Sequence, residues 1–245
     1  MGSALYHEAV DWNDYDAALF DLDGVLTPTA IVHMAAWDEM FNAFLSARGA
    51  APYTPQDYFD HVDGKPRYDG VRDMLASRGI ELPEGDPSDP ADTDTVCGLG
   101  NRKNDAFNEV LERDGVTAYP GSVALVEALA SRGVKMAVVS SSKNAPSVLE
   151  AAGIDRFFPV VVDGRVAGED GLRGKPAPDT FLAAADRLGV TRERAVVLED
   201  ATSGVAAGRA GDFGLVVGVD RGAGETALVA AGADVVVTDL QEIVP

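Results

Sequence analysis

The chain has 245 residues, 46% of them hydrophobic, and a formal net charge of −20. This length allows one large domain, or a core domain with a smaller insert. The strong acidity argues against nucleic acid as a partner, because phosphate backbones require a basic protein face. The sequence contains no apolar run that approaches the roughly 20 residues needed to span a bilayer. We therefore expect no membrane partner, and any bound phosphate must occupy a local positive pocket.

Cysteine content and the first residues bear on the cellular compartment. Cys97 is the only cysteine, so no intrachain disulfide can form. The N-terminal residues lack the basic and then apolar order of a signal peptide. A cytoplasmic protein is therefore expected, and we expect it to be a monomer.

The first half of the chain is predicted to hold one strand and then only helices. Residues 17–20 are a short apolar run typical of a buried strand. Apolar residues at helical spacing follow it up to residue 45, and Arg48-Gly49 is a typical helix end. Further helical patterns cover 55–62, 68–77 and 95–113, and residues 82–95 are expected to form a solvated loop.

After residue 119, short Val-rich runs alternate with helical stretches, which is typical of βαβ units and a mostly parallel sheet. Because the strand at 17–20 precedes the helical block, that block must be inserted into the α/β part. We therefore predict a Rossmann-like, doubly wound parallel sheet core of residues 1–30 and 117–245, with an all-helical cap at 31–116. The expected strands are 134–139, 160–162, 195–198, 214–219 and 235–237, and the expected helices are 122–132, 145–152, 179–188 and 202–210.

Polar residues directly follow three of the predicted strands. Asp21 and Asp23 follow the first, Ser140 follows the second, and Glu199 and Asp200 follow a later one. In an open parallel sheet, ligands bind beyond the carboxyl ends of the strands. These side chains should therefore converge on one pocket.

The pair Asp21 and Asp23 suggests phosphoryl transfer onto an aspartate. Residues at i and i+2 of a strand project on the same side. One carboxylate can attack phosphorus, while the other moves a proton to or from the entering or leaving oxygen.

The remaining polar residues could balance the charge of such a reaction. Asp200 and Asp21 can hold Mg²⁺, a hard ion that takes carboxylate and phosphate oxygens, and Glu199 could bind it directly or through water. Lys175 would supply a fixed cation, and the Ser140 hydroxyl a hydrogen bond to a phosphate oxygen.

The order of these motifs resembles that of the haloacid dehalogenase superfamily. It reads Asp21-x-Asp23-Gly, then Ser140, then Lys175-Pro-x-Pro, then Glu-Asp200. Asp23 points to the phosphatase and phosphomutase branches, because the dehalogenases lack it. The resemblance implies an aspartyl-phosphate enzyme that uses Mg²⁺. Its catalytic residues would be Asp21, Asp23, Ser140 and Lys175, and its metal site would be formed by Asp21, Asp23, Glu199 and Asp200.

From residue 16 onward the chain more closely resembles the β-phosphoglucomutase family. Arg67 falls where that family grips the phosphate that is not transferring, and Ser142-Lys-Asn144 matches its partner in the core. The resemblance implies a phosphorylated sugar as substrate and the interconversion of β-glucose 1-phosphate and glucose 6-phosphate. The implied substrate-binding residues are Thr29, His33, Trp37, Arg67, Lys103, Ser142, Lys143 and Asn144.

Three positions depart from the family pattern. The cap loop reads Asp63-Gly-Lys-Pro-Arg67, whereas a Ser usually precedes that Arg. Pro28 stands in place of an acidic residue, and Ala201 in place of a common Ser. None of these departures removes a catalytic group, but the cap loop leaves the identity of the sugar open.

Simpler structural roles exist for several of these residues. Asp200 and Asn144 each precede a predicted helix and could serve as its N-cap. Arg67 and Lys103 could lie on a solvated face, and His33 could be a core histidine. Ser140 could be only a turn residue, and Trp37 could serve only to pack the cap.

Two other functions stay open beside the mutase. One is a sugar-phosphate hydrolase that uses the same covalent step with water as the final acceptor. The other is a phosphate-binding protein that has lost turnover, although every catalytic position is filled. A binding site for a second phosphate at Arg67 would distinguish the mutase from the hydrolase.

Overall fold

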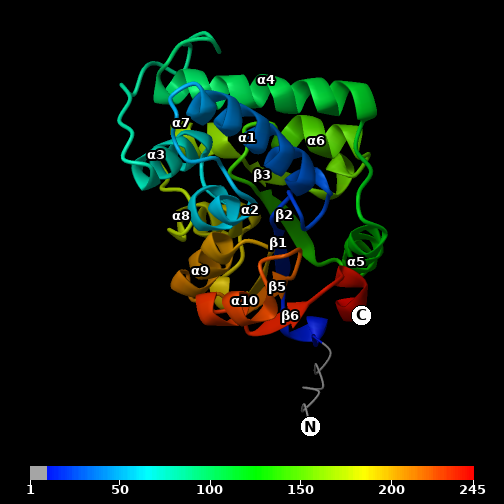
Figure 1. The fold of residues 1–245 in the computed structure, drawn as a ribbon. Helices are drawn as coiled ribbons and strands as arrows, with labels where there is room; N and C mark the ends of the chain where they lie inside the picture. Colours follow the sequence, from blue (N-terminus) through cyan, green and yellow to red (C-terminus); the bar gives the residue numbers. More distant parts are fainter. Residues whose placement is uncertain (1–9) are drawn as a thin grey trace.

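The computed structural model describes residues 10–245, and the N-terminal residues 1–9 inspected above for a signal peptide lie outside the described residues. Its centre is a six-stranded sheet in which every pairing is parallel, in the order β3-β2-β1-β4-β5-β6 (Figure 1). This confirms the predicted Rossmann-like core. The strands are β1 (Ala17–Phe20), β2 (Lys135–Val139), β3 (Val160–Val162), β4 (Ala195–Glu199), β5 (Leu215–Val219) and β6 (Val235–Val237).

Helices cover both faces of the sheet, so the core is doubly wound. The even-numbered residues of β1, such as Phe20, pack with α5 (Pro120–Ser131) and α6 (Ala145–Ala151) on one face. Odd-numbered residues such as Leu19 pack with α8 (Asp179–Leu188) on the other. Helices α9 (Thr202–Ala210) and α10 (Glu225–Ala231) extend that second face over β5 and β6. The strand order reverses between β1 and β4, and ligands of such sheets bind at this point.

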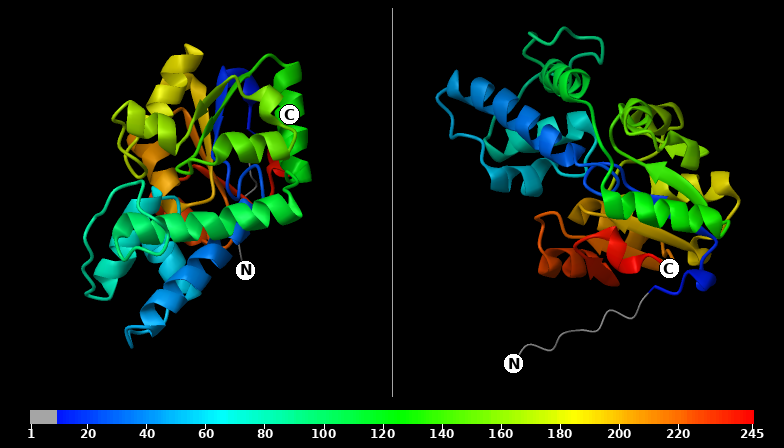
Figure 2. Two further views of the ribbon diagram at one scale, coloured as in Figure 1. Left: turned by 90° about the horizontal axis from the view of Figure 1, so that it is seen from above. Right: turned by 90° about the vertical axis from the view of Figure 1, so that its right-hand side faces the viewer.

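The helical block has a hydrophobic cluster of its own, which includes Phe41, Met74 and Leu99. Figure 2 shows these helices gathered to one side of the sheet, over the carboxyl end of β1. The domain boundaries stay a prediction, and the first helix of this block begins at Thr29, two residues before the predicted boundary. The helices are α1 (Thr29–Ser46), α2 (Pro55–Asp57), α3 (Arg67–Ser77) and α4 (Val96–Asp114).

Some segments differ from the predicted elements. The helix expected at 55–62 is the short α2 followed by a π-helical turn, Tyr58–Val62. The sequence did not predict α7 (Gly164–Glu169) or α10. The 3₁₀ turns are Trp12–Asp14, Asp155–Phe157, Arg192–Arg194 and Leu240–Ile243. Within residues 10–245, no helix combines the length and apolarity that a membrane span requires.

The cap cluster predicts that Phe41→Ala will strongly destabilise the protein. Phe41 is fully buried between Trp37 and Tyr53, and emptying such a site costs about 3–5 kcal/mol. Urea denaturation measures the loss. The matched control is Ile31→Ala on the same helix, where the side chain is 67% exposed and the expected change is within about 0.5 kcal/mol. Equal losses in the two variants would contradict a packed cap core.

Candidate active site

A cavity of about 760 Å³ lies between the cap and the carboxyl ends of the strands. The four core motifs recognised in the sequence meet there, although up to 179 positions separate Asp21 from Asp200 in the chain. Asp21 follows β1, Ser140 follows β2, and Glu199 and Asp200 stand at the end of β4. Lys175 enters from the loop before α8 and completes the core wall.

Lys175 holds two buried carboxylates at the floor of the cavity. Its Nζ lies 2.5 Å from Asp21 Oδ1 and 2.5 Å from Glu199 Oε1, and it donates to the Val139 carbonyl at 3.0 Å. Burial acts to lower the pKa of Lys175, but Asp21 and Glu199 outweigh it, so the pKa is raised. Lys175 therefore stays charged and fixes the Asp21 side chain beside the cavity.

The acidic residues at the strand ends fit a hard divalent cation. Ligand oxygens of Asp21, Glu199 and Asp200 all lie within 4.8 Å of one another. Burial and the neighbouring carboxylates raise the pKa of both Asp21 and Asp200, so an added cation would relieve their repulsion. Asp23, predicted as a fourth ligand, has its side chain outside this group. An all-oxygen donor set is the one that Mg²⁺ prefers.

The helix that follows β4 shows that Asp200 has no capping role. The N-cap residue of α9 is Ala201, and the Asp200 carboxylate is turned toward Gly24 instead. A Cβ added to Gly24 would lie 1.8 Å from Asp200 Oδ2. The loop after β1 and the end of β4 are thus in direct contact at the acidic group.

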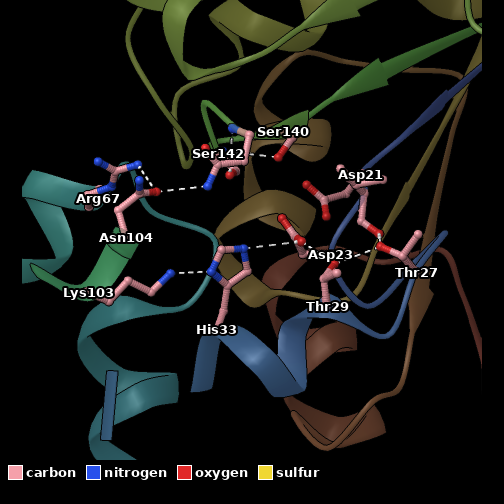
Figure 3. A network of polar contacts seen from close by, with 12 residues as sticks. Asp21, Asp23, Thr27, Thr29, His33, Arg67, Lys103, Asn104, Ser140 and Ser142 are labelled. Atoms are coloured by element: carbon pink, nitrogen blue, oxygen red, sulfur yellow. Dashed lines mark hydrogen bonds and ion pairs between the residues drawn. The ribbon is translucent and has the colours of Figure 1, made fainter. Parts of the chain in front are cut away.

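Asp23 faces the cap (Figure 3). Its Oδ1 accepts a hydrogen bond from Thr29 Oγ1 and lies 3.4 Å from His33 Nε2. Burial acts to raise the pKa of Asp23, but His33, Thr29 and Lys103 outweigh it and hold the pKa at about 2. Asp23 is therefore a carboxylate at neutral pH. Thr29, predicted to touch the substrate, is not among the described residues that line the cavity; it orients Asp23.

His33, Trp37 and Lys103 form the adjoining cap wall, as shown partly in Figure 3. His33 stacks on Phe107 with ring centroids 4.0 Å apart, and its Nδ1 contacts Lys103 Nζ. Lys103 lies between the Trp37 and Phe107 rings, 5.1 Å from each centroid. Burial, with a contribution from Arg67, lowers the pKa of Lys103 to about 7. Lys103 is thus a buried cavity residue and does not lie on a solvated face.

The second polar end of the cavity joins the cap to the core. Asn104 Oδ1 accepts from Arg67 Nη2 at 2.6 Å and from Asn144 Nδ2 at 2.9 Å. Asn144 is the N-cap residue of α6, yet its side chain makes this bridge. Ser142 Oγ accepts from Asn144 N at 3.1 Å, and Lys143 lies over the cap residue Tyr68. The predicted residues from both domains therefore meet here, with Asn104 as the link.

Comparison with known proteins decides the family. The family model of haloacid dehalogenase-like hydrolases matches residues 15–212. The chain belongs to this family. It is 52% identical over 238 residues to the β-phosphoglucomutase of Mycobacterium bovis, which covers 93% of this chain and 90% of that protein. It is therefore an enzyme of the phosphotransferase and phosphatase type.

Two further comparisons widen this picture. A phosphorylated carbohydrates phosphatase of Thermotoga maritima is 27% identical over 225 residues, 89% of this chain and 92% of that protein. The crystal structure of β-phosphoglucomutase from Clostridium difficile has a TM-score of 0.76 at 24% identity and covers 94% of this chain and 93% of that one. This likeness confirms the fold of a haloacid dehalogenase-like core with a cap.

The cap loop of this family member is attached to the core by two serine hydroxyls that the sequence analysis missed. Ser203 Oγ donates to the Asp63 carbonyl at 3.0 Å, and Ser141 Oγ donates to the Gly64 carbonyl at 2.8 Å. Gly64 has φ +68°, and a Cβ there would lie 2.2 Å from Ser203 Oγ. A residue with a Cβ at this position would adopt a strained backbone conformation and would displace Ser203 or the loop.

Two further cavity residues were not predicted. Tyr58 and Asp63 line the cavity from the cap. Burial, with the charges of Glu199 and Asp23, raises the pKa of Asp63 to about 7, although a hydrogen bond from Tyr58 opposes the shift. The sequence did single out the loop that begins at Asp63, but only for its departure from the family pattern.

Lys103 predicts a pH-dependent stability. Its pKa of about 7 in the folded protein lies below the roughly 10.4 of an exposed lysine. Between these values the unfolded chain binds more protons, so the free energy of unfolding rises with pH. From pH 7 to pH 9 we expect the wild type to gain about 2 kcal/mol relative to Lys103→Met. Urea denaturation at each pH measures the difference, and parallel pH profiles for the two proteins would contradict it.

The cap loop predicts that Gly64→Ala will impair turnover. The new methyl group would push the loop away from Ser203 and Ala201, so we expect kcat/KM for p-nitrophenyl phosphate with Mg²⁺ to fall by more than about tenfold. Gly79→Ala is the control, since Gly79 has φ +65° and no described atom lies within 4 Å of its added Cβ. If both variants lose activity equally, backbone strain and not cap closure is responsible.

Proposed function

We propose that this enzyme is a Mg²⁺-dependent phosphomutase that works through an aspartyl-phosphate and interconverts β-glucose 1-phosphate and glucose 6-phosphate. The observation that carries the proposal is the presence of two separate polar ends in one cavity. Asp21 and Lys175 stand at one end, and Arg67, Asn104 and Asn144 stand at the other. A bisphosphate intermediate needs two such ends, whereas simple hydrolysis needs only the first.

In this proposal, Asp21 is the nucleophile. Its carboxylate attacks the phosphorus of a sugar phosphate, the bond to the sugar oxygen breaks, and the phosphoryl group is carried on Asp21. Lys175 and the Ser140 hydroxyl hold the transferring phosphoryl oxygens. Asp21, Glu199 and Asp200 would hold Mg²⁺, which offsets the negative charge of the phosphoryl group.

Asp23 is the proton carrier. Its carboxylate accepts the proton of the sugar hydroxyl that attacks the phosphoryl group of Asp21. In the other half-reaction it returns that proton to the sugar oxygen that leaves phosphorus. Thr29 and His33 fix the carboxylate between these steps. The proton gained in one half-reaction is thus the one used in the next.

Arg67, Ser142, Lys143 and Asn144 hold the distal phosphate. Their location on both domains makes binding of this phosphate favour the closed cap, which excludes water from the phosphoryl group. The Arg67–Asn104–Asn144 contacts bridge cap and core. His33, Trp37 and Lys103 would contact the sugar between the two phosphates. We further propose that the enzyme acts as a monomer in the cytoplasm.

A sugar-phosphate phosphatase is the second candidate. Two observations favour it: the Thermotoga maritima relative named for phosphatase activity, and Pro66, which stands before Arg67 where the mutase family usually has Ser. Pro66 cannot supply a hydroxyl to the distal phosphate. Water would then be the final acceptor of the phosphoryl group from Asp21.

Phosphorus NMR distinguishes the two candidates. The protein is given β-glucose 1-phosphate, Mg²⁺ and a trace of β-glucose 1,6-bisphosphate. We expect glucose 6-phosphate to accumulate with wild type and to be absent with Asp21→Asn, which cannot attack phosphorus. Inorganic phosphate with free glucose would instead establish the phosphatase. If wild type turns over neither this sugar nor other phosphorylated sugars, both proposals are wrong.

Removing the Arg67 contact to the distal phosphate should lower kcat/KM of the mutase reaction by about 100-fold. Arg67→Ala deletes a charge-assisted contact to phosphate and the bond to Asn104. The control is Arg48→Ala, also on the cap, where the guanidinium lies over Phe44 and pairs with Asp94. Coupled measurement of glucose 6-phosphate formation gives the rates. Loss of less than about threefold in Arg67→Ala would contradict a distal phosphate site.

A further inference from the structure

The loop after β1 is held by its backbone carbonyls. Those of residues 24–26 accept hydrogen bonds, in order, from Arg221 Nε at 2.9 Å, Ser122 Oγ at 2.7 Å and Tyr119 N at 2.9 Å. This loop carries Asp23 and follows Asp21 directly. Three consecutive carbonyls are thus fixed by two segments that are remote in sequence, the start of α5 and the turn after β5.

Arg221 makes the longest of these connections. It follows β5, and β4 lies between β5 and β1 in the sheet, so the side chain reaches past the end of β4 to Gly24. Its Nη1 donates to the Thr238 carbonyl at 2.8 Å, and its guanidinium lies 4.1 Å from the centroid of the Tyr119 ring. The Asp220 carboxylate fixes the turn by accepting from the backbone N–H groups of residues 222 and 224. Arg221 is therefore held in place on three sides.

The residue that Arg221 holds is in contact with the acidic group. Gly24 has φ +90°, and its Cα faces Asp200 so closely that a Cβ would lie 1.8 Å from Oδ2. Its N–H donates to the Thr27 carbonyl at 2.7 Å, which closes the turn after Asp23. A shift of Gly24 would therefore move the Asp23 backbone and alter the packing against Asp200 together.

We propose that Arg221 is a positioning residue for phosphoryl transfer: it holds the Gly24 carbonyl so that Asp21 and Asp23 keep their places relative to Asp200. Arg221 is not among the described residues that line the cavity, so it acts through the loop and touches no substrate. The inference rests on the proposed role of Asp21 as nucleophile, but it does not depend on which sugar is bound.

The test compares Arg221→Ala with Arg209→Ala. Arg209 offers a matched control because its Nε and Nη2 donate to the carbonyl of Gly232, which also has a positive φ (+115°), at 3.0 and 2.7 Å. That contact joins α9 to the segment after α10 and lies apart from the loop after β1. Hydrolysis of p-nitrophenyl phosphate gives kcat and KM, calorimetry gives the affinity for Mg²⁺, and thermal unfolding gives the stability.

We expect Arg221→Ala to lower kcat by about 10- to 100-fold, since misplacement of reacting groups by about 1 Å costs this much, while KM changes less than about twofold. The dissociation constant for Mg²⁺ should rise severalfold. Arg209→Ala should keep kcat and the Mg²⁺ affinity within about twofold of wild type even where its melting temperature falls. If the two variants have equal kcat and equal Mg²⁺ affinity, the positioning role is wrong.

A second variant keeps the proposal testable if Arg221→Ala does not fold. Arg221→Lys retains a cation and one donor for the Gly24 carbonyl but loses the simultaneous bond to Thr238. We expect kcat between those of wild type and Arg221→Ala, and a value equal to that of wild type together with unchanged Mg²⁺ affinity would overturn the proposal. If wild type itself hydrolyses no aryl phosphate, the Mg²⁺ affinities still decide the role of Arg221, while the formation of glucose 6-phosphate tests the proposed function separately.

Discussion

The crowding of like charges at the ends of β1 and β4 is the constraint on which the site depends. Asp21, Glu199 and Asp200 lie within reach of one ion, while Lys175 is the buried cation that contacts two of them. One lysine cannot neutralise three carboxylates in a buried setting, and burial together with the neighbouring carboxylates raises the pKa of Asp21 and of Asp200. A divalent cation would offset the negative charge of these carboxylates, and it would also bind the oxygens of a phosphoryl group. Because the whole chain is acidic, binding of a negatively charged substrate depends on the few cationic side chains at the site.

Cap and core contribute different parts of the chemistry. The core supplies rigid strand ends and so fixes the nucleophile, while the cap supplies Arg67 and Lys103 through helices. Asn104 joins the two domains by accepting from Arg67 and Asn144. Under the proposed function the same groups that bridge the domains would bind a phosphate, which would couple ligand binding to cap closure. The serine contacts to the cap loop stabilise the same closed arrangement.

The surroundings of Asp23 differ from those of Asp21. Its carboxylate is surrounded by donors, whereas Asp21 is surrounded by other carboxylates and one lysine. Two aspartates two residues apart thus have opposite pKa shifts, because one side chain faces the cap and the other faces the acidic end of β4. The turn at Gly24, held by Arg221, keeps the two environments apart.

The sequence by itself determined the parallel α/β core, the inserted helices and the convergence of Asp21, Ser140 and Asp200, because hydrophobic periods and strand-end motifs are local signals. The sequence did not show that the Thr29 side chain donates to Asp23 and does not line the cavity. Nor did it show that Arg221 contacts the loop after β1, because this contact joins positions 197 residues apart. Nor did the sequence predict the short helices α7 and α10. Tertiary structure alone decided which donors surround each carboxylate, since pairing, burial and pKa depend on distances between segments that the order of residues does not fix.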